Sequence, residues 1–122
     1  MEFQIDFYQC VNGRLYAREF LANLKEKNPD LRVKTLACIT KLKHKNYHKE
    51  PHSESFGAGL FGVRAKFGSD ISRVFYCFGK GQMIYLLRGF IKKSQKTPDD
   101  EIEKARKLLK EFKESEKYYG KN

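Results

Sequence analysis

The chain has 122 residues, which is enough for one domain with a hydrophobic core, and we expect a single domain over residues 1–122. Hydrophobic residues make up 40% of the chain and aromatic residues 14%, a composition that excludes a disordered protein. Lys and Arg number 25 against 15 Asp and Glu, a formal net charge of +10, which favours a polyanionic partner: nucleic acid, an acidic protein or an anionic membrane surface.

The sequence predicts a cytoplasmic protein with no membrane segment. Glu2 and Asp6 interrupt any apolar run of a signal peptide, and no apolar stretch reaches the length that spans a bilayer. Cys10, Cys38 and Cys77 are far apart, odd in number and set in apolar surroundings. This pattern is typical of reduced core thiols, and it does not fit a disulfide framework or a zinc site.

The first half of the chain predicts one strand and two helices. Residues 2–8 alternate apolar and polar side chains, as a half-buried strand does. Residues 15–27 and 31–44 repeat apolar side chains with a helical period, and Asn-Pro-Asp separates them, which indicates a helical hairpin. Residues 43–59 show no period and are expected to form a loop.

The second half predicts a three-stranded antiparallel meander followed by a helix. Residues 60–67, 71–78 and 82–91 have strand character, and short glycine-containing turns join them. Thr97 is a suitable N-cap for a helix over residues 98–117, whose first turn is acidic. The order of these elements implies an α+β fold.

Cations gather on one face of the predicted meander and in the loop after it. Arg64 and Lys66 point the same way, and Arg73 follows the next turn, so that it can lie near Arg64 across the strand pair. Further along the chain come Arg88, Lys92, Lys93 and Lys96. Together these side chains can surround one phosphodiester, although a solvated basic face without catalysis fits the spacing equally well.

RNA is the first substrate to consider for such a face. Its 2′-hydroxyl can attack the adjacent phosphate without a metal, so we expect no metal or other cofactor. The protein must activate that hydroxyl, stabilise charge on the phosphorane and protonate the leaving 5′-oxygen. Arg offers a fork of donors for phosphate oxygens, and a partly desolvated Lys can transfer a proton.

The histidines and tyrosines carry weaker signals. The histidines have no carboxylate or cysteine partners at ligand spacing, so a proton donor is more plausible than a metal site. Tyr76 and Tyr85 can stack on bases, but tyrosines in the middle of a strand more often belong to the core. The three histidines are His44, His48 and His52.

Short motifs occur along most of the chain. They are Arg18 to Leu24, Val63-Arg64, Gly68, Ser72-Arg73-Val74, Leu86-Leu87-Arg88-Gly89-Phe90, and Lys92-Lys93 through Pro98 with Glu101 and Ala105. In these motifs the chain resembles the HigB branch of the RelE/ParE toxin superfamily, including its phage-derived members. The resemblance covers nearly the whole chain, and the Lys-Lys-Ser-Gln-Lys-Thr-Pro segment is its most specific part.

The resemblance implies a RelE-like fold and the toxin of a type II toxin–antitoxin pair, which enters the ribosomal A site and cuts the translated mRNA. Its partner would be a HigA-like antitoxin with a helix-turn-helix domain. Arg64, Arg73 and Lys93 or Lys92 match the family's functional basic positions. Two positions depart from the family pattern, because Gly62 stands where Glu is common and Arg88 where His is common. Arg is too weak an acid to replace that His as a proton donor.

The leading hypothesis is a metal-independent, ribosome-dependent mRNA endoribonuclease. Arg64 and Arg73 are expected to stabilise the scissile phosphate, and Lys66, Lys92 or Lys93 to orient it or transfer a proton. Other basic residues are expected to contact RNA, namely Arg88, Lys96, His48 and Lys45. One alternative is a ParE-like toxin that binds a protein target such as gyrase and cuts nothing. Another is a non-toxic RNA-binding or phage accessory protein.

Overall fold

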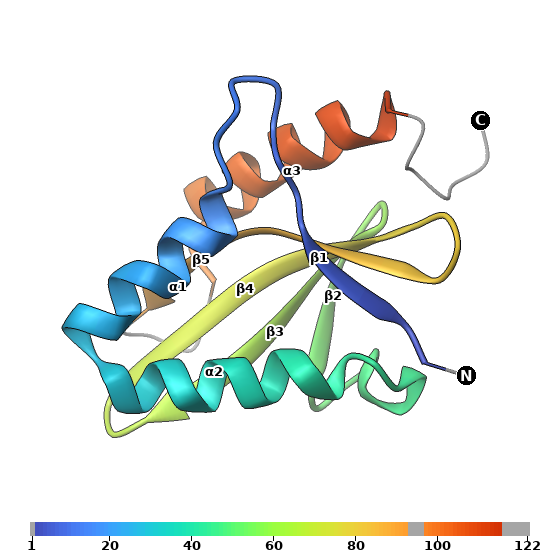
Figure 1. Cartoon of the computed structure of the whole chain (residues 1–122). Helices are drawn as coiled ribbons and strands as arrows, with labels where there is room; N and C mark the ends of the chain where they lie inside the picture. Colours follow the sequence, from blue (N-terminus) through green and yellow to red (C-terminus); the bar gives the residue numbers. More distant parts are fainter. Residues whose placement is uncertain (1, 93–96, 116–122) are drawn as a thin grey trace.

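The computed structural model of the chain describes residues 2–92 and 97–115. These residues form three α-helices and one sheet, and Figure 1 shows the helices arranged about the sheet. The helices are α1 (Tyr16–Lys27), α2 (Pro29–Lys41) and α3 (Asp99–Lys113), and a short 3₁₀ turn, η1 (Lys45–Tyr47), follows α2. The strands are β1 (Gln4–Phe7), β2 (Ser53–Gly57), β3 (Leu60–Phe67), β4 (Asp70–Gly79) and β5 (Met83–Lys92). This confirms the predicted α+β class and is consistent with a RelE-like fold.

The sheet is mixed, with the strand order β1-β5-β4-β3-β2. The meander β3-β4-β5 is antiparallel as predicted, and β1 joins it as a parallel neighbour of β5. The prediction of a loop over residues 43–59 was wrong in part, because this segment contains η1 and the edge strand β2. The sequence of β2, Ser-Glu-Ser-Phe-Gly, has little intrinsic strand preference, and its pairing with β3 holds it in place.

The helical hairpin covers one face of the sheet (Figure 1). Asn28 ends α1 and begins α2, because its side-chain oxygen accepts a hydrogen bond from the Leu31 N–H at 3.1 Å and Pro29 occupies the first helical position. The side-chain amide of Asn28 also donates to Asp70 on β4 at 3.0 Å, which ties the hairpin to the sheet. The apolar cluster on this face includes Leu21, Leu24, Leu31, Val63, Val74, Tyr76 and Ile84.

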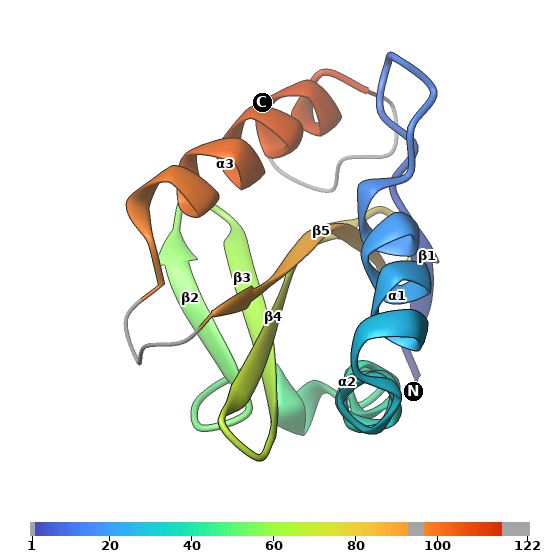
Figure 2. The same ribbon diagram turned by 90° about the vertical axis from the view of Figure 1, so that its left-hand side faces the viewer.

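The third helix covers the opposite face (Figure 2). Its buried side chains pack with residues from β3, β4 and β5, as the predicted apolar face of the helix requires. Pro98 is the N-cap residue and no side chain caps the helix, so the predicted capping role of Thr97 is wrong. The cluster on this face includes Leu60, Phe75, Cys77, Leu87, Ala105, Leu109 and Phe112.

A bulge in β5 changes which way the end of this strand faces. Tyr76 pairs with Leu86, but Phe75 pairs with Arg88, so β5 has one extra residue at this point. Leu87 therefore packs on the α3 side, and Arg88 also reaches Glu101 on α3. On the other face, Gly89 leaves room for Phe20 of α1, whose ring atom lies 2.4 Å from where a Cβ would stand.

The cysteines and the mid-strand tyrosines belong to the interior. Cys10 and Cys77 are buried and Cys38 is half-buried, and all three are reduced. Burial raises the pKa of the Cys77 thiol to about 12. Tyr76 is fully buried and donates to the Ser53 hydroxyl at 2.7 Å, as expected of a core tyrosine, and Tyr85 is also buried. Within residues 2–92 and 97–115, no helix is both long and apolar enough to span a bilayer.

Candidate functional site

Basic residues of three neighbouring strands meet on the side of the sheet that carries α3. Arg64 of β3 lies directly opposite Arg73 of β4, as the sequence predicted. On β5, Lys92 lies opposite Ile71, two pairs along the ladder from the pair of Arg73 with Phe90. Because alternate residues of a strand face the same side, Arg73 shares this side with the buried Phe75 and Cys77.

Arg73 is the most buried cation of the group. It is 3% exposed, and its Nη1 donates to Oε1 of Glu54 on β2 at 2.8 Å. Its guanidinium carbon lies 5.6 Å from the centre of the Phe56 ring. Burial lowers the pKa of Arg73 and Arg64 lowers it further, while Glu54 acts in the opposite direction. Nε of Arg73 is buried and has no hydrogen-bond partner among the described residues.

The contact between Arg73 and Glu54 passes over Gly62. Glu54 on β2 lies opposite Gly62 on β3, and Gly62 lies opposite Phe75 on β4. A Cβ at Gly62 would stand 3.0 Å from Cδ of Arg73 and 3.0 Å from the Phe56 ring. The missing side chain therefore gives Arg73 the space to cross β3 and reach β2.

Lys92 is the second buried cation, with 3% of its surface exposed. Burial lowers its pKa first, followed by the positive charges of Arg73 and Arg64, while Glu54 raises it. The positive charges of Arg73 and Arg64 act on Lys92 because all three side chains project from the same side of neighbouring strands. A lysine ammonium with a lowered pKa gives up its proton more readily than an exposed one.

The other predicted residues lie at the margin of this group or outside the described chain. Lys66 is exposed and lies two residues after Arg64 on the same side of β3. Arg88 lies where β5 meets α1 and α3: its Nη2 is 3.4 Å from Oε1 of Glu101, and its guanidinium carbon is 5.7 Å from the Tyr16 ring. Lys93 and Lys96 lie outside the described residues.

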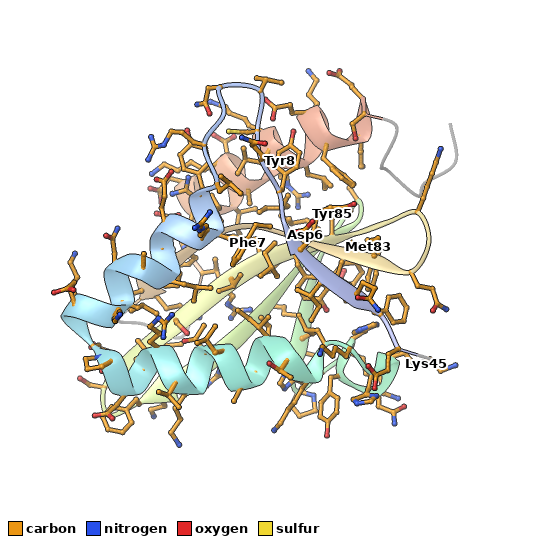
Figure 3. All side chains as sticks on the ribbon, viewed as in Figure 1. Asp6, Phe7, Tyr8, Lys45, Met83 and Tyr85 are labelled. Atoms are coloured by element: carbon orange, nitrogen blue, oxygen red, sulfur yellow. The ribbon has the colours of Figure 1, made fainter. Side chains whose placement is uncertain are left out.

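The structure does not bring His48 and Lys45 together with Arg73. A ring nitrogen of His48 lies 2.6 Å from the Leu42 carbonyl oxygen, and its ring packs edge-on against Phe3 at 4.8 Å and Phe78 at 5.0 Å. These two phenylalanines belong to the cluster on the α1 and α2 face. Lys45 is exposed in η1, near the start of β1 (Figure 3). Among the described residues, no three His, Cys, Asp or Glu side chains are placed to hold a metal ion.

A comparison with protein-family models decides the family. Residues 20–110 match the family described as phage-derived protein Gp49-like (DUF891), and this is well over half of the chain. The chain belongs to the Gp49-like family. This family is toxin-like and related to toxins of the RelE and HigB type. The matched region contains Arg64, Arg73, Lys92 and Glu54. No curated protein matches the chain.

Sequence reasoning missed two site residues of this Gp49-like protein, Glu54 and Phe56. Both lie in the segment that was predicted to be a loop. One signal was available, because Glu54 and Phe56 are spaced as neighbours on one side of a strand and a Gly-Ala-Gly turn follows them. Five residues with two serines and a glycine are too short and too weakly apolar to stand out by periodicity.

The Gp49-like site combines anion binding with two kinds of proton-transfer group. Two guanidinium groups and an ammonium group attract a phosphate, and their charges outnumber the carboxylate of Glu54. That carboxylate is 42% exposed, so a substrate hydroxyl can reach it. A carboxylate can accept a proton, and a desolvated ammonium group can donate one. The arrangement therefore suits the cleavage of a phosphodiester that carries its own nucleophile.

Proposed function

We propose that this Gp49-like protein is a HigB-like toxin of a type II toxin–antitoxin pair that cuts mRNA on the ribosome. The observation that carries the proposal is the buried guanidinium of Arg73, held between the carboxylate of Glu54 and the cations Arg64 and Lys92. Glu54 balances one of these three positive charges, so a further anion would reduce the repulsion among them. The phosphodiester of RNA is the anion that best fits the positive charge of this site and the net charge of +10 of the whole chain.

Arg73 and Arg64 would bind the non-bridging oxygens of the scissile phosphate. Charge on these oxygens increases in the phosphorane, and donors held in place by the sheet stabilise it without reorganising. Nη1 of Arg73 donates to Glu54, and its buried Nε makes no hydrogen bond among the described residues. Arg64 is exposed on the neighbouring strand and can approach the phosphate from the solvent side.

Glu54 and Lys92 would carry the two proton transfers. Glu54 accepts the proton of the 2′-hydroxyl as its oxygen attacks phosphorus and the P–O5′ bond breaks, and Lys92 gives a proton to the leaving 5′-oxygen. The products are a 2′,3′-cyclic phosphate and a 5′-hydroxyl, so no water or metal enters this step. Lys92 has a lowered pKa, which suits it to the donor role that Arg88 cannot fill.

The remaining basic surface would dock on the ribosome and on mRNA. Lys66 lies beside Arg64, whereas Lys45 and His48 lie near the start of β1 and contact a different part of the RNA in this proposal. Lys96 and Arg88 keep the RNA-contact role expected of them, and Lys93 keeps the expected role of orienting the phosphate or transferring a proton. A HigA-like antitoxin with a helix-turn-helix domain is the proposed protein partner.

The decisive experiment incubates the purified protein with ribosomes programmed with mRNA and maps new RNA 5′ ends. We expect cleavage by the wild type, none by Arg73→Ala, and full cleavage by Arg18→Ala, an exposed arginine of α1 that serves as the matched control. Intact mRNA with the wild type contradicts the proposal, as does an Arg73→Ala variant that still cuts. Inhibition of DNA gyrase without loss of mRNA would instead support the ParE-like alternative.

A further inference from the structure

Two basic side chains of α3 bind the tip of the β2–β3 hairpin. The guanidinium of Arg106 donates to the backbone carbonyl oxygen of Phe56, and its Nη1 donates to that of Gly57 at 3.2 Å. Lys113 donates to the carbonyl oxygen of Ala58 at 2.9 Å. Three consecutive carbonyls of the hairpin are thus held by two residues about two turns apart on α3, and the hairpin tip lies against this helix (Figure 2).

These carbonyls need such donors because the hairpin is irregular. The register of β2 on β3 shifts between Ser55 and Gly57, so Phe56 is an extra residue without a partner on β3. Gly57, Ala58 and Gly59 all have positive φ angles, of 88°, 56° and 87°. Such a conformation is unusual for an alanine, and it directs the local carbonyls out of the ladder. Arg106 supplies donors that β3 does not.

The same short strand carries the acidic side of the candidate site. Glu54 is two residues from Phe56, and the ring of Phe56 lies 5.4 Å from that of Phe75 and 5.6 Å from the guanidinium carbon of Arg73. The strand β2 is at the edge of the sheet, so β3 is its neighbour on one side only. A change in the position of β2 would therefore move Glu54 away from Arg73.

We propose that Arg106 is a positioning residue, which fixes β2 so that Glu54 stays in contact with Arg73. Lys113 supports it at the next carbonyl. The catalytic consequence rests on the function proposed above, but the positioning itself does not. Arg106 touches backbone carbonyls and no group that binds substrate in that proposal, so its effect on the reaction passes through the placement of Glu54.

The test compares Arg106→Ala and Arg106→Lys with Lys107→Ala, the neighbouring exposed residue of α3, as control. NMR would record the side-chain signals of Arg73, assigned with an Arg73→Lys variant, and the hydrogen exchange of amides 53–61. For Arg106→Ala we expect the Arg73 signals to shift toward those of a Glu54→Gln variant and the hairpin amides to exchange faster. Arg106→Lys should restore both in part, because one donor remains.

Ribosome-dependent cleavage supplies the second readout. Arg106→Ala should lower kcat by about ten- to a hundredfold with little change in KM. This is expected when a small displacement of the Glu54 carboxylate leaves it poorly aligned with the reacting hydroxyl. The positioning role is overturned if Arg106→Ala leaves the Arg73 signals and the hydrogen exchange of the hairpin amides unchanged. It is also overturned if the hairpin amides exchange faster in this variant while kcat stays normal. If the wild type cuts no RNA, the proposed function fails, and the NMR comparison still decides whether Arg106 places Glu54.

Discussion

The guanidinium of Arg73 and the carboxylate of Glu54 meet at 2.8 Å although their strands are not neighbours. The strand β3 lies between them, and Gly62 is the residue of β3 over which the Arg73 side chain passes. A buried cation and a half-exposed anion are thereby joined across three strands. Any side chain at Gly62 would compete with this contact for space.

Gly62→Ala is expected to impair the site more than the fold. The new Cβ would stand 3.0 Å from both Cδ of Arg73 and the Phe56 ring, so both side chains must shift. We expect loss of the Arg73–Glu54 contact, a fall in cleavage of about tenfold or more and a stability loss of about 1 kcal/mol. Ribosome-dependent cleavage and urea unfolding measure the two effects.

A double-mutant comparison shows whether Gly62→Ala acts through Arg73. If it does, Gly62→Ala should cost less stability in an Arg73→Ala variant than in the wild type, because only the Phe56 ring then remains 3.0 Å from the new Cβ. Additive losses of stability in the double variant would mean that the new methyl group disturbs β3 itself.

Glu54→Gln should separate proton transfer from charge pairing. Glutamine keeps an acceptor oxygen for Arg73 but cannot take a proton from the 2′-hydroxyl, so kcat should fall by about a hundred- to ten-thousandfold. Solvent screens the half-exposed carboxylate, so stability should fall by only about 1 kcal/mol. Glu50→Gln is the matched control, since Glu50 also acts on Arg73 through its charge and makes no hydrogen bond with it in the structure. Equal losses in the two variants would contradict a proton-accepting role for Glu54.

Much of this site could be predicted from the sequence, because strand alternation decides which residues share a face. Alternation placed Arg64 and Lys66 together, and the short turn before β4 placed Arg73 beside Arg64. The apolar runs of β4 and β5 indicated central strands that are covered on both faces, as the two clusters show.

The acidic half of the site could not be predicted in the same way. Glu54 belongs to a strand that exists because β3 pairs with it and because Arg106 and Lys113 bind its irregular end. Tertiary contacts of this kind leave no period in the sequence. The burial of Lys92 and the location of His48 on the opposite face are likewise consequences of packing.

Lys92→Arg tests the proton donor through the pH dependence of cleavage. Burial and the charges of Arg73 and Arg64 lower the pKa of Lys92. In the wild type, Lys92 therefore loses its proton below the usual lysine pKa of 10.5, and the cleavage rate falls there. Arginine stays protonated over the whole range but gives up its proton poorly. The variant should keep RNA binding, lose cleavage by about a hundredfold or more and lose the alkaline fall in rate.

Lys66→Arg is the control for that profile. Lys66 is exposed on the same side of the sheet, so its replacement should leave the alkaline fall in place. An alkaline fall that persists unchanged in Lys92→Arg would assign the proton transfer to another group.

Cys77 is expected to make the fold sensitive to alkaline pH. Its pKa rises from 9.0 to about 12 on burial, so above pH 9 the unfolded chain loses a proton that the folded chain retains. The stabilisation is complete below pH 9 and is lost as the pH rises toward 12, amounting to a loss of about 2 kcal/mol at pH 10.5. Tyr76, with a pKa raised from 10.0 to about 12 by burial, adds a further loss of stability above pH 10.

Urea unfolding under reducing conditions between pH 7 and 10.5 measures the effect of Cys77. The free energy of unfolding should fall more steeply with pH for the wild type than for Cys77→Ala. Cys38→Ala is the control, because Cys38 is half-buried and should contribute less. Parallel curves for the wild type and Cys77→Ala would show that the thiol ionises equally well in the folded chain.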